Sequence, residues 1–92
     1  MNSSTPVEGL RALADPVRWS IVEELRGGTR CACTLAEVAG ISAPLLSHHL
    51  KVLRQAGLVT AARRGRWMDY TLNEAVIDAL ADTLAGGVGS RR

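Results

Sequence analysis

Cysteine is scarce in this chain of 92 residues, which contains only Cys31 and Cys33. A single pair is not the disulfide framework that stabilises small secreted domains. With one residue between them, the two cysteines are poorly placed to bond to each other, so we expect reduced thiols in a reducing compartment. The cysteine content therefore argues against a disulfide-stabilised extracellular module.

Long apolar runs are also lacking. The segment Met1–Val7 is polar and has no apolar signal core, and no run approaches the roughly 18 apolar residues of a membrane span. We therefore expect a cytoplasmic protein with no membrane partner.

Strong net charge is absent too, since the formal net charge is only +2. The charge is uneven, however: residues 1–46 hold four Lys/Arg against five Asp/Glu, and residues 47–92 hold seven against four. A basic surplus confined to one half predicts contact between that half and nucleic acid. A hydrophobic content of 47% is ordinary for a globular protein. We expect one domain over residues 1–92, small enough to favour a homodimer.

Two helices are predicted in the first third of the chain. Apolar residues at helical spacing predict a short first helix: Val7, Leu10 and Leu13. Asp15 followed by Pro16 is typical of a helix start, so a second helix is expected from there to about Arg26. We expect Trp19 to pack in the core with that helix.

A helix-turn-helix follows. Thr34 and Glu37 match a capping box, which predicts a short third helix over residues 35–39, closed by Gly40. Ser42 is expected to cap a fourth helix that continues to about residue 55 and stops at Gly57. Two helices of this length with a tight turn between them are typical of DNA-binding proteins.

A β-hairpin and a last helix complete the expected fold. Residues 58–63 and 67–72 favour strands, and the three residues between them favour a turn. A final helix is expected from Asn73 to about Leu84, followed by a flexible basic tail over residues 86–92. The fold class is therefore mainly α with a small β-hairpin, in the order α-α-α-α-β-β-α, with about residues 6–85 ordered.

Cys31 and Cys33 stand directly before the predicted helix-turn-helix. Extended backbone there would place residues two apart on the same face, so both sulfurs could chelate one ion. Arg30 and the positive end of the following helix dipole should favour the thiolate forms, which bind metal ions and react with electrophiles.

Several motifs in register resemble the ArsR/SmtB family of winged-helix homodimeric repressors. The matching segments are residues 15–18 (DPVR), 47–54 (SHHLKVLR), 56–59 (AGLV) and 65–70 (GRWMDY). The resemblance covers about residues 7–84. The run Cys31-Ala32-Cys33 is similar to the Cys-x-Cys of the arsenic and antimony sensors, in which those cysteines bind As(III) or Sb(III) and release the repressor from its operator. The resemblance thus implies As(III) or Sb(III) as inducer, no organic cofactor and no enzymatic activity.

The sequence departs from the family pattern at three places. Ala36 stands where well-known arsenic sensors have a third cysteine, so the resemblance leaves the third metal ligand open among water, an external thiol and a partner group. The segment 1–6 lacks the cysteines that cadmium and lead sensors add. The last helix offers Asp78 and Asp82 but no histidine, which argues against the zinc, nickel and cobalt branch.

The residues expected at each surface follow from the predicted elements. The DNA-binding candidates lie on the fourth helix and at the hairpin tip: Ser42, Ala43, Leu45, Ser47, His48, Lys51, Arg63, Arg64 and Arg66. The apolar stripes of the first and last helices are candidates for the dimer interface: Val7, Leu10, Leu13, Val76, Leu80 and Leu84.

Rival interpretations remain open. The same scaffold suits a repressor that responds to thiol oxidation or to Cd or Pb, and a winged helix also serves in some proteins as a protein-interaction module. His48 and His49 are adjacent, so on a helix they point in different directions, and only His48 is expected to face DNA. Ser47 beside these histidines has no oriented acid or oxyanion loop, which argues against a hydrolase.

Overall fold

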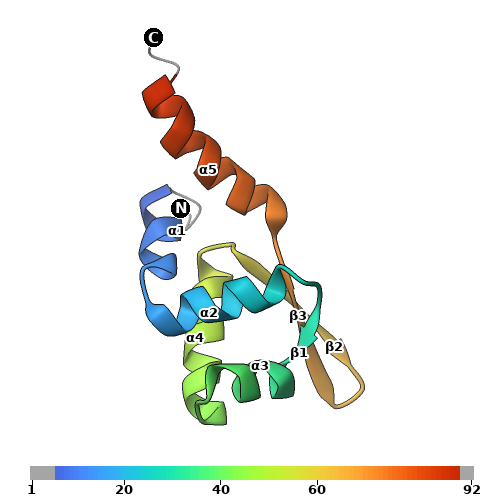
Figure 1. Cartoon of the computed structure of the whole chain (residues 1–92). Coiled ribbons are helices and arrows are strands. Elements are labelled where there is room, and N and C mark those ends of the chain that lie inside the picture. The colour runs from blue at the N-terminus through green and yellow to red at the C-terminus, as the bar shows by residue number, and fades with distance from the viewer. Residues whose placement is uncertain (1–5, 90–92) are drawn as a thin grey trace.

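Eight elements make up the chain in the computed structural model, which describes residues 6–89 (Figure 1). They are α1 (Pro6–Leu13), α2 (Pro16–Leu25), β1 (Arg30–Cys31), α3 (Ala32–Ala39), α4 (Ala43–Gln55), β2 (Val59–Arg64), β3 (Trp67–Leu72) and α5 (Glu74–Gly89). Helices α2, α3 and α4 form the body with the strands on one side of it, and α5 extends away from the body beyond α1 (Figure 1). This is a winged helix-turn-helix, as predicted. No helix in the described part is long and apolar enough to cross a membrane.

Side-chain caps fix where two of the helices start. The Asp15 carboxylate accepts hydrogen bonds from the backbone N–H groups of Val17 (2.9 Å) and Arg18 (3.0 Å) at the start of α2. The Ser42 hydroxyl accepts one from the Leu45 N–H (3.3 Å) at the start of α4. Each cap satisfies amides that the first helical turn leaves without a partner. Both helix starts match the sequence prediction.

The core lies where α2, α3 and α4 meet the sheet. Leu35, Leu53 and Leu58 are completely buried, and Ile21 and Leu25 of α2 are nearly so. Burial of each such side chain contributes about 1.5–3 kcal/mol. Because residues 21, 22 and 25 form the buried face of α2, Trp19 lies off that face and is 47% exposed. The prediction that Trp19 packs in the core was therefore wrong.

The sheet has three antiparallel strands in the order β1-β3-β2. Strands β2 and β3 form the predicted wing, whose turn contains Gly65 in the left-handed region (φ 63°). Strand β1 was not predicted. It pairs Arg30 with Tyr70 and Cys31 with Asp69, so the cysteine segment is joined directly to the wing.

Two element boundaries differ from prediction. Helix α3 begins at Ala32 rather than at Leu35, because Cys31 takes the N-cap position and its Sγ accepts a hydrogen bond from the Cys33 N–H (3.2 Å). Thr34 therefore lies inside the helix. Helix α5 continues to Gly89, so residues 86–89, expected in a flexible tail, are helical. The rest of that tail and residues 1–5 lie outside the described residues.

Candidate nucleic-acid interface and thiol pair

Helix α4 presents one face to the core and another to solvent. Leu46, Leu50 and Leu53 are buried. All the DNA-binding candidates predicted on and just before this helix are exposed: Ser42, Ala43, Leu45, Ser47, His48 and Lys51. These six residues are thus accessible on the sides of α4 that the core leaves uncovered, as a recognition helix requires.

The two adjacent histidines of α4 separate as predicted, with His48 exposed and His49 only 8% exposed. Arg18 of α2 donates a hydrogen bond from Nη1 to His49 Nδ1 (3.2 Å) and another from Nε to the Ala12 carbonyl of α1 (2.6 Å). Burial lowers the pKa of His49. Sequence reasoning missed this contact, because Arg18 and His49 are 31 residues apart.

The wing arginines differ in their contacts. Arg64 forms a bidentate ion pair with Asp69 across the hairpin, with Nε–Oδ2 2.6 Å and Nη2–Oδ1 3.0 Å. This hydrogen bonding lowers the pKa of Asp69 and raises that of Arg64. Arg63 donates to the Gly65 carbonyl (3.3 Å). The Arg66 side chain is exposed and makes no hydrogen bond or ion pair within residues 6–89, so it is the wing arginine most available to a phosphate.

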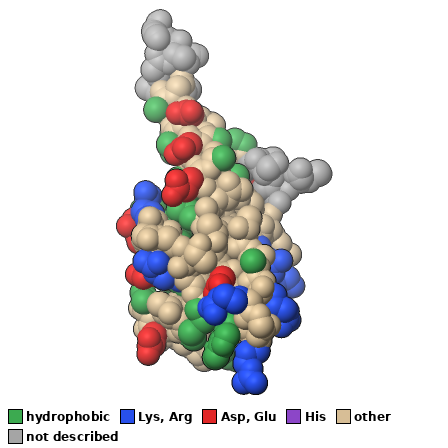
Figure 2. Space-filling model, turned by 90° about the vertical axis from the view of Figure 1, so that its right-hand side faces the viewer, with side chains coloured by type: hydrophobic (Ala, Val, Ile, Leu, Met, Phe, Trp, Pro, Cys, Tyr) green, Lys and Arg blue, Asp and Glu red, His purple; other side chains and the backbone are tan. Residues whose placement is uncertain are grey.

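Charge is unevenly distributed over the face that Figure 2 shows, which is the side of the molecule that lies to the right in Figure 1. Lys and Arg side chains gather at the lower end and along the right edge, acidic side chains follow α5 above, and further acidic side chains lie beside basic ones in the middle and at the left. The acidic residues of α5 are exposed and spaced four apart: Glu74, Asp78 and Asp82. These carboxylates would repel a polyanion from α5.

Cys31 and Cys33 lie at the N-terminus of α3, and their sulfurs are bonded in a disulfide, with the two Cα atoms 5.3 Å apart. The expectation that this spacing is poorly placed for such a bond was wrong. The extended backbone of Cys31 leads directly into the first turn of α3, and this bend brings the two sulfurs together. Cys33 is exposed and Cys31 is half-buried, so the pair is open to solutes.

Arg30, which was predicted to favour the thiolate forms, is itself ion-paired with a carboxylate. Its Nε donates to Glu24 Oε2 of α2 (2.9 Å), and its Nη1 donates to the Thr29 carbonyl (3.1 Å). The guanidinium charge is therefore matched by a carboxylate. The group of α3 that does contact a cysteine sulfur is the Cys33 N–H, which donates to Cys31 Sγ (3.2 Å).

The donor set of the thiol pair suits a soft ion with few protein ligands. Residues 6–89 contain no group of three His, Cys, Asp or Glu side chains placed to hold a metal ion. The protein thus offers two sulfurs at one point, and thiolates are the ligands that soft ions prefer. A third ligand would have to come from outside the described chain.

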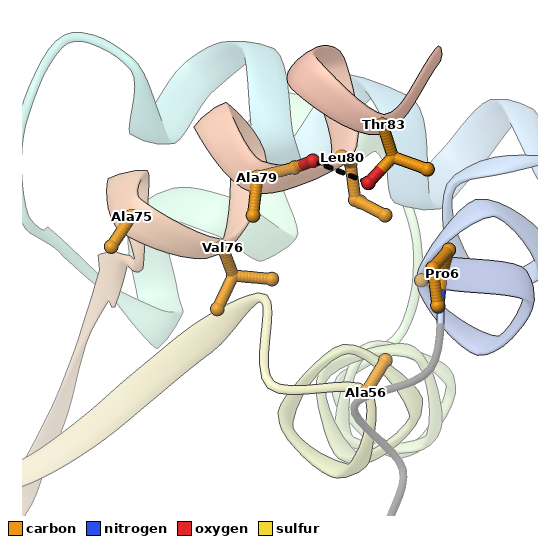
Figure 3. A pocket seen from close by; sticks show the side chains of 8 residues that line it. Pro6, Ala56, Ala75, Val76, Ala79, Leu80 and Thr83 are labelled. Atoms are coloured by element: carbon orange, nitrogen blue, oxygen red, sulfur yellow. Dashed lines mark hydrogen bonds between the residues drawn. The ribbon is translucent and has the colours of Figure 1, made fainter. Parts of the chain in front are cut away.

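An apolar groove lies between α1 and α5. It is a pocket of about 260 Å³ in which Val76 and Leu80 of α5 face Pro6 of α1 and Ala56 at the end of α4 (Figure 3). Beside it, Val7 is 60% and Leu84 is 56% exposed. Leu80 is already buried within the chain, at 8% exposed, because it packs on α1 at Gly9. Of the predicted dimer residues, Val7 and Leu84 have the most apolar surface left to cover.

Comparison with known proteins agrees with this architecture. The family model for bacterial regulatory proteins of the arsR family matches residues 15–61. The HTH-type transcriptional repressor SmtB of Mycobacterium tuberculosis is 46% identical over 79 residues, which cover 80% of this chain and 58% of SmtB. This chain thus spans little more than half the length of that relative. The arsenical resistance operon repressor of Bacillus subtilis is 39% identical over 71 residues, covering 76% of this chain and 68% of the repressor.

One solved structure adds a statement about assembly. An NMR structure of a homodimeric winged helix-turn-helix DNA-binding domain from Mycobacterium bovis, described as a possible ArsR-family regulator, superimposes with a TM-score of 0.72 at 27% identity, covering 90% of this chain and 83% of that one. The family match, the identities and the shared fold agree with one another, and they point to transcriptional regulators rather than enzymes. The chain belongs to the ArsR family of bacterial regulatory proteins.

Proposed function

We propose that this protein is a homodimeric repressor that binds operator DNA through α4 and the wing, and that As(III) or Sb(III) releases it by binding Cys31 and Cys33. The observation that carries the proposal is the meeting of the only two cysteine sulfurs at the N-terminus of α3, the first helix of the helix-turn-helix. The B. subtilis relative, an arsenical resistance operon repressor, supports the choice of inducer.

DNA binding is supported by the exposed face of α4 and the wing arginines. In a homodimer like that of the M. bovis domain, two recognition helices would meet successive major grooves of a pseudo-palindrome. Val7 and Leu84, together with the groove between α1 and α5, would form the dimer seam, since they hold exposed apolar surface at the end of the molecule away from the wing.

The position of the thiol pair suggests how a bound ion would act on DNA binding. Cys31 belongs to β1, which pairs with β3 of the wing, and it also caps α3. An ion held by both sulfurs would replace the hydrogen bond from the Cys33 N–H to Cys31 Sγ. The two elements proposed to bind DNA, α4 and the wing, would then both be affected, because α3 contacts α4 and β1 contacts the wing.

A second candidate is a repressor that senses thiol oxidation. The disulfide between Cys31 and Cys33 supports it, because the two sulfurs lie where oxidation can join Cys31 of β1 to Cys33 of α3. The two candidates differ in what they need: a metalloid sensor responds under reducing conditions, whereas a redox sensor needs an oxidant.

The test is fluorescence anisotropy with duplexes selected by the protein from a random pool. The buffer contains a phosphine reductant, which has no thiol to compete for As(III). The proposal expects arsenite or antimonite to weaken binding by about 5- to 150-fold, the range of ordinary allosteric coupling. Release by a disulfide-forming oxidant alone would favour the redox candidate, and absence of duplex binding would contradict both.

A further inference from the structure

His49 is the one buried polar side chain among those that the structure describes. It sits on α4 directly after the exposed His48, on the side of the helix that faces the protein. A buried polar group without a partner costs about 1–3 kcal/mol, so its contacts matter for where α4 can lie.

The contacts of His49 join three helices. Arg18 of α2 donates from Nη1 to His49 Nδ1 (3.2 Å) and from Nε to the carbonyl of Ala12 in α1 (2.6 Å). The Asp15 carboxylate holds the Arg18 N–H (3.0 Å), and its Oδ2 lies 3.9 Å from His49 Nδ1. Together Ala12, Asp15, Arg18 and His49 form what we call the Arg18 network.

The network works with only one form of the imidazole. Arginine donates hydrogen bonds and cannot accept them, so His49 Nδ1 must be an acceptor and the ring is neutral, with its proton on Nε2. Burial and the Arg18 charge both lower the pKa of His49, and only the Asp15 carboxylate opposes them. A proton added at Nδ1 would face the Arg18 guanidinium and would have Asp15 as its nearest acceptor.

We propose that Arg18 and His49 are positioning residues that hold recognition helix α4 against the junction of α1 and α2, and that protonation of His49 releases this hold. The inference rests on the proposed DNA-binding homodimer. Since α1 belongs to the proposed dimer seam, the Arg18 network is the polar link between that seam and the helix that reads DNA. It therefore governs how the two recognition helices of a dimer are set relative to each other.

The sign of the pH effect follows from the lowered pKa. Folding keeps His49 neutral, so the stability that the network contributes is full above the ordinary value of 6.5 and decreases as pH falls from there through the lowered pKa, at which His49 of the folded protein takes up its proton. The groups that face His49 are Arg18 and Asp15 at the start of α2 and His48 on its own helix. Operator affinity of the wild-type protein should therefore fall on acidification.

The experiment compares the wild-type chain with three variants on its selected duplex and on a scrambled duplex, between pH 7.5 and pH 5.5. His49→Asn places an oxygen acceptor where Nδ1 lies but cannot be protonated. It should keep operator affinity at pH 7.5 and remove the acid-dependent part of the loss. His49→Leu should reduce the preference for the operator about tenfold or more, with nonspecific binding and its salt dependence unchanged. Asp82→Asn, an exposed carboxylate on α5 outside the Arg18 network, is the control and should keep the wild-type acid loss.

The outcomes separate this inference from the proposed function. A wild-type protein that binds no duplex would overturn both. If the wild type binds its operator but His49→Asn shows the same acid loss, or His49→Leu keeps full preference, the positioning role is wrong and the repressor proposal stands. If His49→Leu does not fold, the pH profile of His49→Asn decides the question. If His49 served only to stabilise the fold, His49→Asn would still lose operator affinity on acidification as the wild type does.

Discussion

At the scale of single residues, capping decides where the helix-turn-helix begins. The sequence pattern of Thr34 and Glu37 predicts a helix start at Leu35, but Cys31 caps α3 three residues earlier. Sulfur is a weak acceptor, so a cysteine is not among the residues that signal an N-cap. The cysteine pair is thus part of the helix start itself, whereas the sequence pattern placed both cysteines before the helix.

A matched pair of cap variants tests this difference. Ser42→Ala removes the cap of α4 and should lower the free energy of unfolding by roughly 0.5–2 kcal/mol. Thr34→Ala should change it by less than about 0.5 kcal/mol, because Thr34 lies inside α3 and caps nothing. Urea denaturation of the reduced proteins measures both. If Thr34→Ala lowered the free energy of unfolding as much as Ser42→Ala does, Thr34 would be a helix cap, and the helix start at Ala32 would be wrong.

At the scale of elements, the sequence was informative wherever a signal is local. Asp15-Pro16 and Ser42 mark the starts of α2 and α4, and alternation with a glycine turn marks the wing, so these elements matched prediction. Strand β1 was missed because two residues carry no periodicity, and its pairing depends on β3, about 40 residues away. The Arg18 network was missed for the same reason.

In the wing, the sequence alone cannot tell which arginine is most available to contact DNA. Three arginines look equivalent in sequence, yet Arg64 is paired with Asp69 and Arg66 is not. Arg66→Ala should weaken binding to all duplexes alike and reduce the log-log salt slope by about one unit. Arg64→Ala should have a smaller effect, since the charge it removes is already partly neutralised. Anisotropy titrations over a range of salt concentrations measure the duplex affinity and its salt slope. If the slope were unchanged in a variant with Arg63, Arg64 and Arg66 all replaced by Ala, the wing would not be part of the DNA interface.

At the scale of the whole molecule, the elongated shape reflects α5 extending from the body, with overall dimensions of 50 × 27 × 24 Å. The apolar residues of α5 differ in burial. Leu80 packs on α1 of the same chain, whereas Leu84 is exposed. The sequence pattern predicts the stripe but cannot separate the chain's own core from a seam between chains, because both need the same apolar spacing.

Leu84→Glu separates these two roles. In one chain the side chain is 56% exposed, so the fold should be unaffected. In a dimer seam the same change buries a charge without a partner and costs several kcal/mol. We expect a folded monomer with little operator affinity, as measured by sedimentation velocity and anisotropy, while Asp78→Ala on the acidic face should stay dimeric. A Leu84→Glu protein that remains a dimer with full affinity would exclude α5 from the seam.

The central claim is that the two sulfurs at the start of α3 control DNA binding. The most direct test is arsenite release of the selected duplex under phosphine-reduced conditions, measured for wild type, Cys31→Ser and Cys33→Ser. Serine is nearly the same size and replaces a soft ligand with a hard one, so duplex affinity without arsenite should change little. Each single variant should lose the release entirely, since one remaining sulfur cannot chelate. The claim would be contradicted if both variants released the duplex at the same arsenite concentration as the wild type.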